Sequence, residues 1–271
     1  MAYSVAGKKV LVTGGSSGIG ADLARGFAEG GATVGICARR TDRLQEVLEV
    51  CRKANPDGDH RMWTVDLSDL DGVQPFARQA DDELGGIDVL VNNAGIPKRR
   101  KVTELRLDEV DSLMTINYLS PVRLTLALLP RMLERGSGRV VTISSIAAHL
   151  APPAEAAYAA TKAAITAFVE SAAVDLWESG IRFHLVNPGI VETELFDLPD
   201  NDASMAGDEV PPLPPSALTE AVLKQLDDDT FEINVPDWFK DVIAGKAQDT
   251  GVFLAGSAAW LAQKNQATAG A

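Results

Sequence analysis

Residues 13–20, Thr13-Gly14-Gly15-Ser16-Ser17-Gly18-Ile19-Gly20, form a glycine-rich segment between two stretches of different pattern. The apolar run Lys9–Val12 precedes the segment, and Ala21–Glu29, which has helical spacing, follows it. Glycines let a backbone turn sharply and approach a pyrophosphate, and the N-terminus of the next helix points free N–H groups at the anion. A bare tight turn is the alternative interpretation. The place of the glycine-rich segment between a first strand and a first helix favours a dinucleotide-binding turn.

Short β-branched runs alternate with longer stretches of helical spacing through most of the chain. The runs lie at Lys9–Val12, Thr33–Cys37, Arg61–Val65, Val89–Asn92, Arg139–Ile143 and Arg182–Val186, with a last one at Phe231–Val235. This alternation predicts an α/β fold, a parallel sheet with helices on both faces. Because 271 residues suit one α/β domain, we expect a single domain over residues 1–271.

The charge and composition exclude several classes of protein. With 25 basic and 38 acidic residues the net charge is −13, which argues against a nucleic-acid partner. The short basic run 98–101 is interpreted as a solvated loop. Two cysteines and three scattered histidines indicate neither a disulfide framework nor a metal site. No stretch approaches the roughly 20 apolar residues of a membrane span, and residues 1–7 do not resemble a signal peptide, so we expect a soluble cytoplasmic protein with no membrane partner.

Tyr158 and Lys162 lie four residues apart in a strongly helical stretch, which places them on one helix face. A nearby ammonium favours the tyrosinate and lowers the tyrosine pKa from its ordinary value of about 10, toward the range useful for general acid/base catalysis. An amphipathic helix surface is the alternative interpretation of this pair. Ser144 and Ser145 end the predicted strand Arg139–Ile143, at the edge where parallel sheets bind ligands, and a hydroxyl there can hold a substrate oxygen.

These motifs together resemble the short-chain dehydrogenase/reductase family over roughly residues 7–196. Residues 13–20 resemble its TGxxxGxG turn, residues 92–95 its NNAG turn, and Tyr158 to Lys162 its YxxxK pair. The resemblance implies a Rossmann-type doubly wound sheet and a nicotinamide coenzyme. It also selects Ser145 over Ser144, and it assigns Asn117, inside a predicted helix at Leu107–Arg135, as a helix-bending residue that holds a water.

The expected site follows from the residues and this resemblance. The expected catalytic residues are Asn117, Ser145, Tyr158 and Lys162. In this interpretation Ser145 orients a carbonyl, Tyr158 protonates its oxygen, Lys162 binds the nicotinamide ribose, and Asn117 with its water returns the proton. The expected coenzyme contacts are Gly14, Ser16, Ser17, Gly18, Ile19, Gly20, Arg39, Arg40, Asp66, Leu67, Asn93, Ala94, Gly95, Tyr158, Lys162, Pro188, Gly189, Val191 and Thr193.

The end of the second predicted strand favours NADP(H) over NAD(H). An NAD enzyme usually has an Asp or Glu there to bind the ribose diol, whereas this chain has Ala38 followed by Arg39 and Arg40. A 2′-phosphate would meet guanidinium groups and the hydroxyls of the glycine-rich turn. In the alternative interpretation, the two arginines cover the next helix and pair with Asp42.

Two segments depart from the regular pattern. The long loop 192–216 is predicted to be a substrate lid, with an apolar lining of Leu195, Phe196, Leu198 and Met205 that favours a hydrophobic substrate. The tail 236–271 differs from the family pattern. Its aromatic residues Trp238, Phe239, Phe253 and Trp260 are expected in the core, the alternatives being pocket cover and contact with a partner subunit. We expect a homodimer through the helices at 107–135 and 156–179, and a tetramer is in doubt.

The favoured function is hydride exchange between a nicotinamide coenzyme and a carbonyl or secondary alcohol. The first alternative is a non-catalytic dinucleotide sensor of the same fold, which would be expected to lose Tyr158 or Lys162. The second is a nucleotide-sugar epimerase or dehydratase. Such proteins share the YxxxK pair but usually have a TGxxGxxG turn and a longer C-terminal domain.

Overall fold

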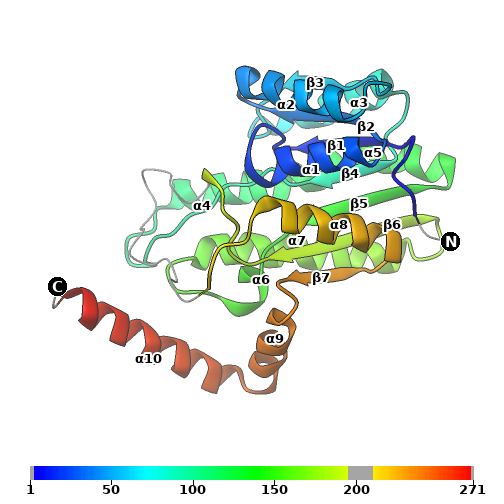
Figure 1. The fold of residues 1–271 in the computed structure, drawn as a ribbon. Helices are drawn as coiled ribbons and strands as arrows, with labels where there is room; N and C mark the ends of the chain where they lie inside the picture. The colour runs from blue at the N-terminus through cyan, green and yellow to red at the C-terminus, as the bar shows by residue number, and fades with distance from the viewer. Residues whose placement is uncertain (1–2, 195–209, 270–271) are drawn as a thin grey trace.

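A parallel sheet forms the centre of the molecule in the computed structural model, which describes residues 3–194 and 210–269. Within the described residues the sheet has seven strands in the order β3-β2-β1-β4-β5-β6-β7 (Figure 1). The strands are β1 (Lys9–Thr13), β2 (Thr33–Ala38), β3 (Arg61–Thr64), β4 (Val89–Asn92), β5 (Gly138–Ile143), β6 (Ile181–Pro188) and β7 (Glu232–Val235). The chain winds outward from β1 to β3 and then returns to β4 on the other side of β1. This reversal confirms the predicted doubly wound sheet and places a ligand crevice at the carboxyl ends of β1 and β4.

Helices cover both faces of this sheet. The helices α1 (Gly18–Glu29), α2 (Thr41–Ala54) and α8 (Pro215–Asp228) pack against one face, and α3 (Leu70–Leu84), α5 (Ser120–Arg135) and α7 (Ala156–Asp175) against the other. Apolar residues spaced four apart, such as Leu23 and Phe27 in α1, are fully buried in the first layer. Leu124 and Leu128 of α5, also spaced four apart, are buried in the second layer. The helical period therefore supplies both halves of the core.

The predicted helix Leu107–Arg135 has the expected ends but is not continuous. It divides into α4 (Leu107–Met114), a π-helical turn η1 (Thr115–Leu119) and α5. Pro121 lies in the first turn of α5 and has no N–H to donate to the carbonyl of Asn117 four residues earlier. The α-helical ladder is therefore interrupted at Asn117, as π-turns often are at functional sites.

The predicted lid is described only at its two ends. Val191 and Leu213 form a parallel bridge, with the Glu192 N–H donating to the Leu213 carbonyl at 2.8 Å. These bonds hold the segments before and after residues 195–209 together. The predicted lining residues Leu195, Phe196, Leu198 and Met205 lie outside the described residues.

The C-terminal tail forms two helices, α9 (Phe239–Gln248) and α10 (Thr250–Ala269), and α10 extends away from the sheet (Figure 1). The short helix α6 (Ala147–Leu150) contacts α9, and the Lys246 ammonium donates to the His149 carbonyl. Of the aromatic residues expected in the core, Phe239 is buried, whereas Trp238 stacks on it and stays 46% exposed. The core expectation is therefore wrong for Trp238, because the tail leaves the sheet directly after β7.

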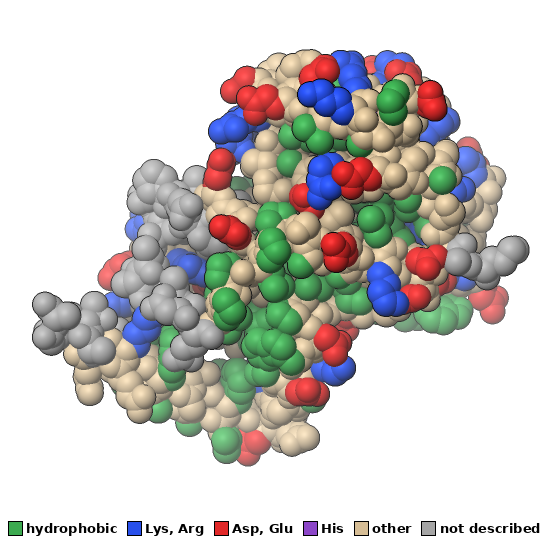
Figure 2. Space-filling view, in the orientation of Figure 1, with side chains coloured by type: hydrophobic (Ala, Val, Ile, Leu, Met, Phe, Trp, Pro, Cys, Tyr) green, Lys and Arg blue, Asp and Glu red, His purple; other side chains and the backbone are tan. Residues whose placement is uncertain are grey.

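The surface in Figure 2 carries hydrophobic side chains around α8 and down to α9, whereas acidic and basic side chains are interspersed at the top over α2. None of the described helices combines the length and apolar character needed to cross a membrane.

Candidate active site

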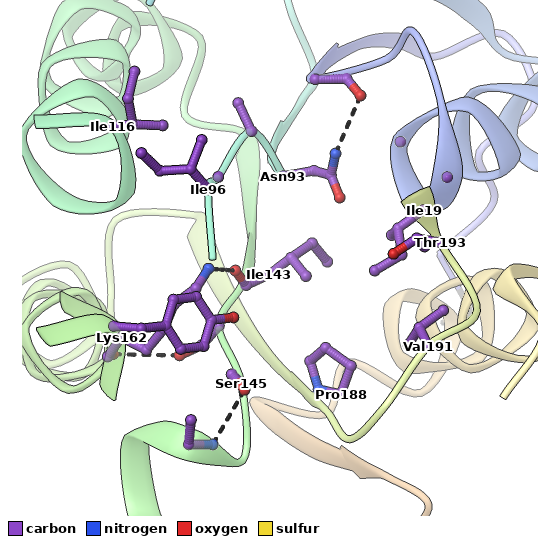
Figure 3. A pocket seen from close by; sticks show the side chains of 18 of the residues that line it. Ile19, Asn93, Ile96, Ile116, Ile143, Ser145, Lys162, Pro188, Val191 and Thr193 are labelled. Carbon is purple, nitrogen blue, oxygen red and sulfur yellow. Dashed lines mark hydrogen bonds between the residues drawn. The ribbon is translucent and has the colours of Figure 1, made fainter. Parts of the chain in front are cut away.

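A cavity of about 1100 Å³ opens at the carboxyl ends of the central strands. Every residue predicted to contact the coenzyme lines this cavity, and so does Ser145. Asn117 is the one predicted site residue that does not line the cavity. Its side chain bonds to Ile96, which does line the cavity. Figure 3 shows Lys162 and Ser145 on one side of the cavity, with Ile19, Val191 and Thr193 across from them.

The glycine-rich turn is packed too tightly for side chains. A Cβ at Gly20 would lie 2.3 Å from the Gly14 carbonyl oxygen. Gly18 has a φ of +53°, and a Cβ there would lie 3.0 Å from Thr193 Cγ2. The first turn of α1 contains no acidic residue, so its free N–H groups face the cavity without a competing carboxylate of their own. The turn therefore fits a bound pyrophosphate.

Thr13 holds the turn at Asn93 and Ala94, which directly follows β4. Its buried hydroxyl accepts hydrogen bonds from the N–H groups of Asn93 and Ala94, each at 3.0 Å, and donates to the Val91 carbonyl at 3.2 Å. The Asn93 side chain donates to the Thr13 carbonyl at 2.9 Å. Thr13 was not among the predicted site residues, although it begins the glycine-rich segment. Its role as an anchor appears only when β1 and β4 are neighbours.

The arginines that follow β2 line the cavity beside the glycine-rich turn, together with the acidic residues Asp66 and Glu194. β2 ends at Ala38, and Arg40 Nη2 donates to Ser17 Oγ at 2.6 Å and lies 3.4 Å from Ser16 Oγ. The structure gives no ion pair between Arg40 and Asp42 among the described residues, and Arg40 instead lies against the glycine-rich turn. On the far wall the Asp66 carboxylate accepts from the Ser68 N–H and hydroxyl, and these bonds lower the pKa of Asp66.

The two adjacent serines have different surroundings. Ser144 Oγ donates to the Lys162 carbonyl at 3.3 Å and lies 3.0 Å from Thr166 Oγ1, so it ties β5 to α7. Ser145 Oγ accepts from the Ala147 N–H at 3.1 Å and interacts with Tyr158. The structure thus brings Ser145, not Ser144, to the tyrosine.

Burial controls the acid/base properties of Tyr158. Desolvation raises the pKa of Tyr158, and the negative charge of Glu155 raises it further, while the hydrogen bond with Ser145 and the charge of Arg99 lower it. The sequence predicted that Lys162 lowers this pKa. The structure contradicts that prediction, because the Lys162 ammonium lies 5.7 Å from the centre of the Tyr158 ring and donates instead to the Ile143 carbonyl at 2.9 Å. Burial also lowers the pKa of Lys162, to about 8.

Asn117 joins the wall of the cavity to α7. Its side chain accepts from the Ile96 N–H at 2.9 Å and donates to the Ile96 carbonyl at 3.0 Å and to Thr161 Oγ1 at 3.1 Å. A Cβ at Gly95 would lie 3.2 Å from Asn117 Oδ1 and 3.6 Å from Lys162 Nζ. Gly95 therefore lies between Asn117 and Lys162 and is close to both side chains.

The wall of the cavity contains a buried ion pair that the sequence did not predict. Arg99 Nε donates to Glu155 Oε1 at 2.7 Å, and both residues are buried and line the cavity. Lys98 and Arg100 pair with Glu109 at 2.9 and 3.3 Å. The solvated-loop interpretation is therefore wrong for residues 98–100, because their acidic partners come from α4 and from the residue preceding α7. Trp260 of α10 also lines the cavity.

Comparison with known proteins agrees with this geometry. The family model for short chain dehydrogenases matches residues 8–202. A short chain dehydrogenase of Pseudocercospora fijiensis is 39% identical over 192 residues, which are 70% of this chain and 61% of that protein. Dehydrogenase/reductase SDR family member 7B of Rattus norvegicus is 38% identical over 69% of this chain and 58% of that protein. The chain belongs to the short-chain dehydrogenase family, and it spans about three fifths of the length of these curated relatives.

Solved structures support the same fold. An alcohol dehydrogenase from Thermococcus sibiricus complexed with 5-hydroxy-NADP has a TM-score of 0.74 and 26% identity, covering 84% of this chain and 95% of that chain. A short-chain dehydrogenase from Sphingobium yanoikuyae in complex with NADPH has a TM-score of 0.77 and 28% identity, covering 89% and 94%. These similarities support a nicotinamide coenzyme as the ligand of the family fold.

Proposed function

We propose that the protein is an NADP(H)-dependent oxidoreductase that exchanges hydride with a carbonyl or secondary alcohol. The observation that carries the proposal is that Tyr158, Ser145 and Lys162 line the same cavity as the glycine-rich turn. Figure 3 shows Lys162 and Ser145 on the side of this cavity opposite Ile19. Bound NADP(H) would supply or accept the hydride at C4 of its nicotinamide ring.

The chain's own residues supply orientation and proton transfer. Ser145 and Tyr158 present two hydroxyl groups to the same substrate oxygen, so that Ser145 holds it and Tyr158 gives or takes its proton. Because burial keeps Tyr158 neutral, its phenol is available as the acid in the reducing direction. Lys162, which lines the cavity, would hold the nicotinamide ribose through a charge-assisted hydrogen bond. Asn117, which lies across Gly95 from Lys162, would hold the water that returns the proton.

Preference for NADP(H) follows from charge at the end of β2. Ala38 offers no carboxylate to the ribose diol, and Arg40 with the hydroxyls of Ser16 and Ser17 provides donors for a 2′-phosphate. Two structural neighbours were solved with NADPH or an NADP derivative. We therefore assign the 2′-phosphate to Arg40.

The substrate side favours an apolar carbonyl compound. Ile96, Ile116, Pro152, Pro153 and Trp260 line the cavity, and two of the charged residues in its wall, Arg99 and Glu155, neutralise each other. Burying apolar surface against this wall supplies the binding energy, since about 25 cal/mol is gained per Å² removed from water.

The outer faces of α5 and α7 support the expected homodimer. Leu126 and Leu133 on α5 are 49% and 40% exposed, and Val174 on α7 and Trp177 just after it are 74% and 70% exposed. An exposed apolar patch built from such residues marks a protein–protein interaction site. The molecular mass of the native protein in solution tests this assembly.

The alternative functions predict different behaviour. A non-catalytic sensor has no need of Tyr158 and Lys162 at the same cavity, and a nucleotide-sugar epimerase would turn over without net consumption of NADPH. The test is the loss of NADPH absorbance with a panel of ketones and aldehydes. Turnover with an apolar member supports the proposal, and coenzyme binding without turnover on any member contradicts it.

Tyr158→Phe is the matched variant because it removes only the phenol oxygen. We expect turnover to fall about 10²- to 10⁴-fold, the usual contribution of a positioned acid, while the Kd of NADPH stays the same. Full activity in this variant would show that Tyr158 is not the acid.

A further inference from the structure

Arg40 has partners on two sides where it lies beside the glycine-rich turn. Its Nη2 donates to Ser17 Oγ at 2.6 Å, while its Nη1 lies 3.3 Å from Glu194 Oε2. Arg43, in the first turn of α2, lies 3.9 Å from the other oxygen of the same carboxylate. Glu194 therefore places its negative charge on the guanidinium that we assigned to the 2′-phosphate.

The position of Glu194 is fixed by the residue before it. Thr193 packs against Gly18, where even a Cβ would lie 3.0 Å from Thr193 Cγ2. The backbone just upstream is held by the Glu192 N–H bond to the Leu213 carbonyl. Because Thr193 lies on the glycine-rich turn, the next side chain reaches from the end of β6 to the end of β2. Glu194 itself lines the cavity.

We propose that Glu194 is an intramolecular competitor of the coenzyme's 2′-phosphate and thereby sets the affinity for NADP(H) relative to NAD(H). The inference rests on the proposed function, since it needs the 2′-phosphate to bind Arg40. A 2′-phosphate must either displace the Glu194 carboxylate from Arg40 or bind beside it against like charge. NAD(H) has no 2′-phosphate and meets neither cost. The phosphate prevails because it carries more charge and more acceptor oxygens than a carboxylate.

The test measures the Kd of NADPH and of NADH for the wild type and for Glu194→Gln by fluorescence titration. Glutamine keeps the size and removes the charge. Because both side chains are about half exposed, the pair is weak, and we expect the Kd of NADPH to fall about three-fold. The Kd of NADH should not change. Glu192→Gln is the matched control, a nearby exposed carboxylate with no ion pair to any residue in the described parts of the chain.

A second variant separates this inference from the coenzyme assignment. Arg40→Gln should weaken NADPH binding about ten-fold, the effect of losing a charged donor, and in that background Glu194→Gln should change the Kd much less. The three-fold effect should also shrink at high salt. If Arg40→Gln leaves the Kd of NADPH unchanged, the 2′-phosphate assignment fails and this inference with it. If Arg40→Gln weakens NADPH binding but Glu194→Gln does not strengthen it, only the competitor role is refuted.

Discussion

Replacing Lys162 with Met should stabilise the protein while removing its activity. The Lys162 side chain is buried, and burial lowers its pKa from the ordinary 10.5 to about 8. Between these values Lys162 binds more protons in the unfolded chain than in the folded one, so its contribution to the free energy of unfolding rises with pH from about 8 to 10.5. Below pH 8 the folded protein carries the full cost of a buried charge, which is roughly 3 kcal/mol for a shift of this size.

The gain from Lys162→Met is smaller than this cost. The variant loses the 2.9 Å bond from Nζ to the Ile143 carbonyl, which contributes about 1 kcal/mol. We therefore expect the free energy of unfolding at pH 7 to be about 2 kcal/mol higher in the variant. The difference should narrow by roughly 2 kcal/mol between pH 7 and pH 9.5, because wild-type Lys162 becomes neutral in the folded state.

The assay is urea unfolding of both proteins without coenzyme at several pH values in this range. Measurements stay below pH 10, where tyrosines of the unfolded chain begin to ionise. A variant that is no more stable than the wild type at pH 7 would refute the reasoning. A stability difference that does not change with pH would also refute the reasoning, because the better packing of Met would then explain it without any change in the charge of Lys162.

Two further variants test burial and close packing elsewhere. His184 is buried as a neutral ring that accepts from Arg139 and donates to the Thr230 carbonyl, and burial lowers its pKa to about 4. As the pH falls from 6.5 to 4, protonation of His184 in the unfolded chain should lower the free energy of unfolding of the wild type by roughly 3 kcal/mol, and His184→Gln should not show this loss. Urea unfolding at each pH measures the difference, and the same pH dependence in both proteins would contradict the prediction. Gly20→Ala places a Cβ 2.3 Å from a backbone oxygen and should weaken NADPH binding about ten-fold through strain of 1–3 kcal/mol, roughly. Gly245→Ala in α9, where a Cβ meets nothing within 4 Å, is its control and should leave the Kd unchanged.

The fold and the grouping of the predicted contact residues around one cavity could be predicted because their signals are local. The glycine-rich segment, the apolar strands and the four-residue spacing of Tyr158 and Lys162 each depend on residues close together in the sequence. Helical and strand periods convert such spacings directly into faces and edges. The predicted coenzyme contacts consequently line one cavity, and the seven predicted strands all appear in the sheet.

Other features depend on residues that are distant in the sequence. Whether the pKa of Tyr158 rises or falls is decided by how deeply the folded protein buries the ring and where the Lys162 ammonium points, and neither follows from their spacing. Arg99 of the basic run 98–101 could not be predicted to be buried, because its partner Glu155 lies 56 residues away in the sequence.

The sequence by itself thus determined the class of fold, the glycine-rich turn after the first strand and the predicted contact residues that line the cavity, because short-range patterns encode them. Only the tertiary structure decided the electrostatics of those side chains. It brought Glu155 to Arg99, Glu194 to Arg40 and Trp260 to the cavity. The physical reason is that charge interactions and desolvation depend on distance and burial in space, which chain folding sets and residue spacing does not.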